Sequence, residues 1–216
     1  MANTRALMDV RPVTLEGVHV RLEPLTMAHH AALWEIAKDH ELWRWTATDI
    51  RSPDDLATYM STALAEQAAG RALPFATIAR EGGAREGGAR EAGRTVGSTR
   101  FGSIEPLNRR AEIGWTWLGG AWQCTAVNTE AKLFMLTHAF ETWGCIRVEL
   151  KTDALNQASR AAIARLGAKE EGTMRKHTVT QTGRVRDTVY YSILDDEWPA
   201  VKARLEARLR KPSERS

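Results

Sequence analysis

The sequence predicts one mixed α/β domain built on a sheet with both parallel and antiparallel strands. Its 216 residues, 43% of them hydrophobic and 26% charged, can bury one core without metals or disulfides. Apolar residues recur with strand and helix periods in the order strand, two helices, three strands, helix, strand, helix, two strands, helix. Consecutive strands favour antiparallel pairing, and the central strand-helix-strand units favour parallel pairing.

The first half of the domain is delimited by alternating apolar residues and by Gly and Pro. We expect residues 1–11 to be a loose leader, residues 12–210 to form the single folded domain, and residues 211–216 to be a tail. Ser52 followed by Pro53 predicts a helix start, and Gly70 predicts its end. The expected elements are strands at 13–15 and 18–22, helices at 27–38 and 53–69, and strands at 73–80, 95–104 and 111–118.

Residues 81–94 form a near-perfect five-residue repeat rich in Gly, Arg and Glu. The segment is too short and too polar to bury a core of its own, so we expect a flexible, expanded hairpin loop without a function. No apolar helix follows its glycines. The repeat is therefore not expected to be a phosphate-binding loop.

The second half contains the most strongly periodic helix of the chain, expected over 129–143. Leu133, Leu136, Phe140 and Trp143 recur at helical spacing, which predicts packing against a sheet. Gly144 predicts its end. The remaining expected elements are a strand at 147–152, a helix at 156–166, strands at 177–180 and 188–194, and a helix at 196–210.

Charge and cysteine usage exclude several classes of protein. With 30 basic and 27 acidic residues the net charge is only +3, and the Arg-rich stretch 204–215 reads as a solvated helix end, so no nucleic-acid partner is expected. Cys124 and Cys145 have no metal-ligand spacing, so we expect free thiols and no metal. No signal peptide and no run of about 18 apolar residues occur, which excludes a membrane partner and favours the cytoplasm. A homodimer remains open.

The loop at 122–130 joins an apolar strand to an apolar helix. The N-terminus of a helix presents unpaired backbone N–H groups and the positive end of the helix dipole. Both features suit a phosphate or pyrophosphate. The loop therefore predicts a phosphorylated cofactor.

Several motifs together resemble a known family. They are Glu112-Ile113-Gly114-Trp115-Thr116-Trp117, Asn128-Thr129-Glu130-Ala131-Lys132, Arg147-Val148-Glu149-Leu150-Lys151-Thr152, Asn156 with Ser159, Leu166-Gly167-Ala168, Glu171-Gly172 and Arg186-Asp187-Thr188-Val189-Tyr190-Tyr191-Ser192. Over about residues 13–209 the chain resembles the GCN5-related N-acetyltransferases, and within them the branch of the ribosomal-protein N-terminal acetyltransferases. The resemblance implies a mostly antiparallel sheet of six to seven strands, splayed at its centre, with helices on both faces and acetyl-CoA in the opening.

The resemblance also assigns cofactor-binding positions. The family's pyrophosphate motif falls on Gln123, Cys124, Thr125, Ala126, Val127 and Asn128, followed by Thr129; further cofactor contacts are implied for Trp115, Thr116, Trp117 and Asn156. At both glycine positions of the motif this sequence has another residue, namely Ala126 and Asn128. Ala126 allows close backbone approach but does not tolerate positive φ as Gly does, whereas Asn128 tolerates it and also caps helices well.

Amide formation from a thioester needs a base that makes the amine neutral and an acid that protonates the leaving thiolate. In this family a backbone N–H on the strand at 113–117 stabilises the oxyanion. The usual tyrosine acid would fall on Ile163 and is absent. The branch's catalytic serine matches Ser159, with Asn156 beside it; the alternative is that the two residues only cap a helix.

Glu112 is the first candidate for the base and Glu105 the second. A carboxylate with an ordinary pKa is a poor base for an amine, so burial would have to raise the pKa. The alternative for either residue is a solvated or salt-bridged carboxylate. Cys124 has no activating His or Asp set, which favours direct attack of the amine over an acetyl-cysteine.

The acceptor side is expected where the segment between the first two helices covers the sheet. Trp43, Trp45 and His177 are candidates for it, with core packing as the alternative for the tryptophans and an exposed strand position as the alternative for His177. The acceptor is expected to be a primary amine, first a protein N-terminus and second a small amine. A third hypothesis is an acyl-CoA sensor without turnover, because the motif glycines and the tyrosine are missing.

Overall fold

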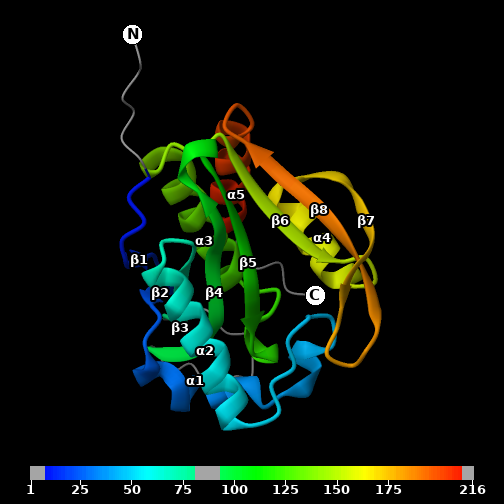
Figure 1. The fold of residues 1–216 in the computed structure, drawn as a ribbon. Helices are drawn as coiled ribbons and strands as arrows, with labels where there is room; N and C mark the ends of the chain where they lie inside the picture. The colour runs from blue at the N-terminus through cyan, green and yellow to red at the C-terminus, as the bar shows by residue number, and fades with distance from the viewer. Residues whose placement is uncertain (1–7, 81–92, 211–216) are drawn as a thin grey trace.

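The computed structural model describes residues 8–80 and 93–210, so residues 1–7 of the leader, residues 81–92 of the repeat and the tail lie outside the described residues. One sheet of eight strands organises the described chain, in the order β1-β2-β3-β4-β5-β6-β8-β7 (Figure 1). The strands are β1 Leu15–Glu16, β2 Val20–Pro24, β3 Leu73–Ala79, β4 Arg94–Glu105, β5 Arg110–Leu118, β6 Arg147–Asp153, β7 Lys169–Val179 and β8 Val185–Leu194. The mixed fold is confirmed, but the sheet has eight strands in place of the expected six to seven.

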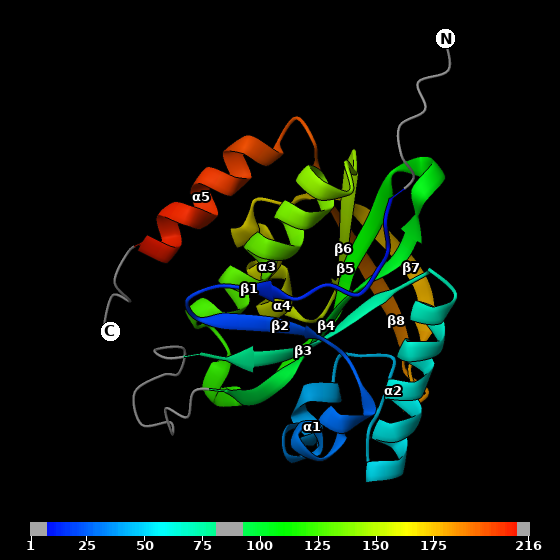
Figure 2. The same cartoon turned by 90° about the vertical axis from the view of Figure 1, so that its left-hand side faces the viewer.

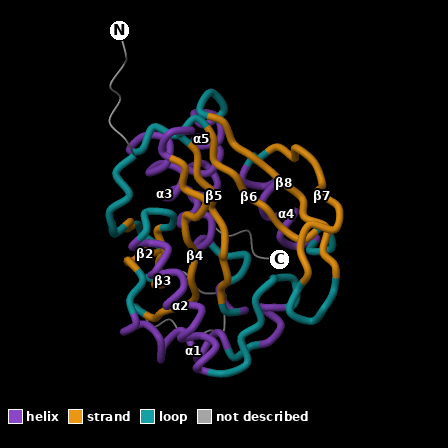
Figure 3. The backbone as a smooth tube through the Cα atoms, viewed as in Figure 1, coloured by secondary structure: helices purple, strands orange, loops and turns teal. Residues whose placement is uncertain are grey.

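At the centre of the sheet, β5 and β6 pair in parallel. This is the only parallel pairing among the described strands. That pairing covers three residue pairs, from Arg110↔Arg147 to Glu112↔Glu149. Beyond Glu112 the two strands diverge, which Figures 1 and 3 show as an opening between β5 and β6. The splay that the family resemblance implies is therefore present.

Helices lie on both faces of the sheet (Figure 2). The helices are η1 Met27–His29, α1 His30–Ala37, η2 His40–Trp43, α2 Pro53–Ala68, η3 Pro106–Asn108, η4 Gly120–Trp122, α3 Ala126–Thr137, the π-helical turn η5 His138–Thr142, α4 Gln157–Leu166 and α5 Trp198–Arg210. On one face α1 and α2 bury a smaller core that includes Leu33, Met60 and Ile78. On the other, α3, α4 and α5 bury the main core. Because β3 is covered on both faces, all its side chains are buried.

The start of α2 illustrates how local sequence determines an element. Ser52 has extended backbone angles, and its hydroxyl accepts a hydrogen bond of 3.1 Å from the Asp55 N–H. Pro53 occupies the first helical position, and Asp54 and Asp55 place negative charge at the positive end of the helix dipole. The predicted start at Pro53 is confirmed.

The predicted strand at 177–180 was too short, because β7 begins at Lys169. Nearly all side chains of β7 are exposed, since β7 is the edge strand of the sheet and only β8 pairs with it. Its sequence therefore has no apolar alternation, and only the hydrogen bonds to β8 reveal it as a strand.

No helix of the described chain is both long enough and apolar enough to cross a bilayer.

Candidate cofactor and acceptor site

Two helices begin where β5 and β6 end. The parallel strands bring their carboxyl ends, at Leu118 and Asp153, to the same edge of the sheet. The chain then continues into α3 after β5 and into α4 after β6. Ligands of open α/β sheets bind at such edges, outside the carboxyl ends of the strands. The opening is therefore flanked by two helix N-termini, each a potential anion site.

The residue with positive φ in the loop before α3 lies two positions before the first glycine position of the motif. Cys124 has a φ of 59°, whereas Ala126 and Asn128 lie inside the helix and have no positive φ. The cap is Thr125, whose Oγ1 accepts a 3.3 Å hydrogen bond from the Val127 N–H. The expectation that the helix starts near Thr129 with Asn128 as its cap is therefore wrong. The two missing glycines cost no backbone strain, because their positions are helical.

The same loop leaves backbone donors at the surface. Gln123 donates from Nε2 to the Leu118 carbonyl at 2.9 Å, which ties the loop to the end of β5. Ala126 and Asn128 are half-buried, and Gln123 and Cys124 are exposed. The N–H groups of the first helical turn have no partner within the helix. This part of the predicted cofactor site thus has the donors that a pyrophosphate needs.

A β-bulge shapes the wall of the opening that β5 forms. Ser98 pairs with Trp117 and Arg100 with Gly114, so that Trp115 and Thr116 together oppose Thr99 alone. Trp115 consequently adopts a φ of 48°. Since β5 has no pairing with β6 beyond Glu112, this stretch faces the opening with unpaired backbone.

Lys132 supports the bulge from α3, and sequence reasoning assigned it no role. Its Nζ donates to Thr116 Oγ1 at 2.8 Å and to Thr99 Oγ1 at 3.1 Å, and the two hydroxyls lie 2.7 Å apart. Only 4% of Lys132 is exposed, and burial lowers its pKa to about 7. A signal was available: Lys132 shares the buried stripe of Met135, Leu136 and Ala139 at helical spacing.

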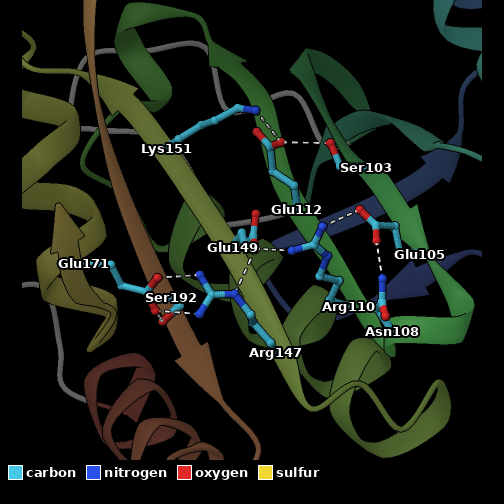
Figure 4. Close-up of polar contacts among 10 residues, drawn as sticks. All are labelled: Ser103, Glu105, Asn108, Arg110, Glu112, Arg147, Glu149, Lys151, Glu171 and Ser192. Atoms are coloured by element: carbon cyan, nitrogen blue, oxygen red, sulfur yellow. Dashed lines mark hydrogen bonds and ion pairs between the residues drawn. The ribbon is translucent and has the colours of Figure 1, made fainter. Parts of the chain in front are cut away.

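Glu112 lies at the point where β5 and β6 separate. It is 3% exposed, and its Oε2 accepts from Lys151 Nζ of β6 at 2.8 Å and from Ser103 Oγ of β4 at 3.2 Å (Figure 4). The ion pair links β5 to β6 just beyond their last backbone pairing. The carboxylate is buried as a base would require, but an ammonium contacts it in place of the expected apolar wall.

Glu105 is the last residue of β4 and pairs with Arg110 at the start of β5, where β5 and β6 are still paired. Arg110 donates to its Oε1 at 2.6 Å and Asn108 to its Oε2 at 2.7 Å (Figure 4). The hydrogen bond from Arg110, with a second from Asn108, holds the pKa of Glu105 below its ordinary value. Arg110 belongs to the region where β5 and β6 are still paired. The structure therefore favours Glu112 over Glu105 as a base.

Asn156 and Ser159 occupy the start of α4. Asn156 Oδ1 accepts the Ser159 N–H at 3.0 Å, which makes Asn156 the helix cap. This cap uses only the backbone of Ser159, a half-buried residue in the first turn of α4. The capping and catalytic interpretations of Ser159 are therefore compatible, because they use different atoms.

The two candidate tryptophans of the acceptor side differ in burial. Trp43 is 5% exposed, donates from Nε1 to the Ala37 carbonyl at 2.7 Å, and its ring centroid lies 5.3 Å from that of Trp117. The structure thus favours the core-packing alternative for Trp43. Trp45 is half-buried, and its ring contacts the Arg184 guanidinium at 5.6 Å.

The segment that carries Trp45 meets the β7–β8 hairpin across the open end of the sheet (Figure 3). The Asp49 N–H donates to Gln181 Oε1 at 2.9 Å, and Arg186 donates to the Trp45 carbonyl at 3.4 Å. His177 is exposed on β7, where its Nδ1 lies 3.1 Å from Thr188 Oγ1. These contacts enclose the side of the opening that is opposite the α3 layer.

A family comparison defines the class of protein. The protein-family model described as the acetyltransferase (GNAT) domain matches residues 19–169 of this sequence. The chain therefore belongs to the GCN5-related N-acetyltransferase family, as the sequence motifs predicted. Among the described residues, no group of three or more His, Cys, Asp or Glu side chains could hold a metal ion.

Individual relatives narrow the similarity. The chain is 35% identical over 100 residues to YdaF of Bacillus subtilis, named as a candidate ribosomal N-acetyltransferase; the match covers 46% of this chain and 54% of YdaF, about half the length of that relative. A GCN5-related N-acetyltransferase from Brucella melitensis has a TM-score of 0.83 at 27% identity, covering 99% of this chain and 92% of its own. RimJ of Mycobacterium smegmatis, solved in complex with CoA-disulfide, has a TM-score of 0.75 at 28% identity, covering 93% and 97%.

Proposed function

We propose that this protein transfers an acetyl group from acetyl-CoA to a primary amine, and that the amine is the N-terminus of a protein or peptide. The observation that carries the proposal is the opening between β5 and β6, which has helix N-termini at its edge and a buried carboxylate where the strands separate. The similarity to YdaF, which is named as a candidate ribosomal N-acetyltransferase, supports a protein as the acceptor.

The residues around α3 fit the diphosphate of coenzyme A. The first-turn N–H groups of Ala126 and Asn128, together with the helix dipole, suit its negative charge. The exposed turn at Cys124 leaves room for close approach to the backbone. When bound, the cofactor supplies an acetyl group activated as a thioester.

The bulge in β5 suits the acyl end of the same cofactor. Its backbone at Trp115 and Thr116 is unpaired toward the opening, so its N–H groups are candidates for stabilising the oxyanion. The hydroxyls of Thr99 and Thr116, held by Lys132, keep this backbone in place. We assign the role of oxyanion donor to this stretch.

Proton transfer requires a base for the acceptor amine and an acid for the departing thiol. Glu112 Oε1 has no hydrogen-bond partner within the described residues, while Oε2 holds Lys151, so Oε1 can accept a proton from the ammonium directly or through water. Ser159 Oγ, at the first turn of α4, is the candidate proton donor. Each assignment is a proposal that the variants described below test.

Calorimetry with acetyl-CoA, followed by thiol release with N-terminal peptides and small amines, tests this function. We expect binding and turnover with peptides. Turnover with small amines but not with peptides would identify a small amine, in place of a protein N-terminus, as the acceptor. Tight binding of acetyl-CoA without turnover would favour a sensor. The two glycine departures that motivated the sensor hypothesis fall on helical positions and no longer support it.

A further inference from the structure

Three cations lie on one face of the sheet beside the opening. Lys151 of β6 is paired with Tyr190 of β8 in the strand register, and side chains two residues apart along a strand share a face. Arg186 of β8 therefore lies on the same face as Lys151, and Arg184, which precedes β8, reaches this face through its ion pair with Asp153 of β6. Figure 4 shows this face at Lys151 and Glu112.

Two of the three cations have carboxylate partners. Lys151 binds Glu112 at 2.8 Å, and Arg184 forms an ion pair with Asp153, whose side chain is fully buried. Arg186 has no carboxylate partner among residues 8–80 and 93–210; the Trp45 carbonyl, at 3.4 Å, is its hydrogen-bond acceptor. Of these three cations, Arg186 is therefore the one whose charge is not matched by a paired carboxylate.

The guanidinium of Arg186 is also poorly solvated. Its Nε is buried without a hydrogen-bond partner in the described chain, and the residue as a whole is half-buried. Burial lowers the pKa of Arg186, which Arg184 lowers further, whereas Asp153, Glu112 and Tyr190 raise it. Both of these carboxylates already hold another cation. An arginine in this state has the capacity to bind one more anion.

We propose that Arg186 binds a carboxylate of the acceptor, so that the preferred acceptors carry a carboxylate close to the amine that is acetylated. The planar fork of a guanidinium matches a carboxylate with two parallel hydrogen bonds. The carboxylate can belong to an acidic side chain of a peptide or to the backbone of a free amino acid. This inference rests on the proposed acetyltransferase function.

Paired acceptors test the preference. One pair is a peptide with Asp at the second position and the same peptide with Asn there; the other is a free amino acid and its amide. We expect the wild-type protein to prefer one carboxylate acceptor roughly tenfold to hundredfold in kcat/KM, mainly through KM, and Arg186→Gln to abolish that preference. A preference confined to the first pair identifies a side chain, and one confined to the second identifies a backbone carboxylate.

Arg208→Gln is the matched control, because it removes the same charge from an exposed position on α5, in the layer on the other face of the sheet. We expect it to keep the wild-type preference. The proposal is overturned if the wild-type protein shows no preference in either pair, if Arg186→Gln keeps it, or if Arg208→Gln loses it equally.

A binding measurement separates this proposal from the proposed activity. Equilibrium binding of the Asp and Asn peptides, followed by tryptophan fluorescence, needs no turnover. We expect the Asp peptide to bind roughly tenfold more tightly to the wild-type protein than to Arg186→Gln, and the Asn peptide to bind both equally. An absence of turnover with this binding difference intact contradicts the activity and supports the carboxylate site; equal binding of both peptides contradicts the site.

Discussion

Replacing Lys132 by Met should change how the stability of the protein depends on pH. In the folded protein burial lowers the pKa of Lys132 to about 7, whereas the unfolded chain restores the ordinary value of about 10.4. Between these values the unfolded chain binds one more proton at this site than the folded protein. The free energy of unfolding must therefore rise with pH across this window, and below pH 7 the contribution is constant.

The magnitude follows from the width of the window. One pH unit inside it changes the free energy of unfolding by about 1.4 kcal/mol, so the step from pH 7.5 to 9.5 adds about 3 kcal/mol through Lys132. Met has a similar length and no charge, so Lys132→Met lacks this increment. For a domain of this size, about 3 kcal/mol corresponds to roughly 6 to 12 °C in Tm.

Urea unfolding of the wild-type protein and of Lys132→Met, at half-unit steps from pH 6.5 to 9.5, measures the effect. The difference in stability between the two should be constant at the acid end and then move by about 3 kcal/mol in favour of the wild-type protein. Lys176→Met, at an exposed position on β7, is the control and should show no such trend. A pH-independent difference for Lys132→Met would refute the reasoning, since it would mean that Lys132 stays protonated when buried.

Three further predictions concern the proposed site. Cys124→Gly should stabilise the protein by up to about 1 kcal/mol and Cys124→Val should destabilise it by at least that amount in thermal unfolding, because φ at this position is 59°; equal stabilities would mean that the turn relaxes. Glu112→Gln should lower kcat by roughly 10² to 10⁴ in thiol-release assays, and an unchanged kcat would exclude Glu112 as the base. Ser159→Ala should lower kcat without a change in Tm. Asn156→Ala should cost about 1 kcal/mol of stability, because it removes the cap of α4. A lower Tm with an unchanged kcat for Ser159→Ala would mean that Ser159 has only a structural role.

The order of the elements could be predicted from the sequence because most of them bury an apolar face. The start of α2 was found from Ser52 and Pro53, which act through contacts within a few residues. The start of α3 was placed three residues too late, because Thr125 and Asn128 are both good caps and only the backbone angles decide between them. β7 was mostly missed because its polar residues gain their strand conformation from pairing with β8.

The candidate site was predictable to the extent that single residue types suggest chemistry. Glu112 stood out as an acid on a strand beside the cofactor loop, and its burial agrees with that interpretation. Lys132 and Arg186 stood inside quoted motifs without a role, because their importance depends on burial and on missing partners. The helical spacing of Lys132 with Met135, Leu136 and Ala139 could have indicated its burial, whereas the missing partners of Arg186 are visible only in the folded structure.

The walls of the opening depend on buried polar groups for a physical reason. An apolar interior between β5 and β6 would close, since contact between the two walls would remove apolar surface from water. Instead, Glu112 and Lys151 join the walls at the inner end, and Lys132 with its two threonines stiffens the bulge. Such groups stabilise less than apolar residues of the same volume, because burial costs them hydration. We therefore expect Lys132→Met to be more stable than the wild-type protein near pH 7 and to bind the cofactor less well, since it removes the donor that holds Thr99 and Thr116 beside the opening.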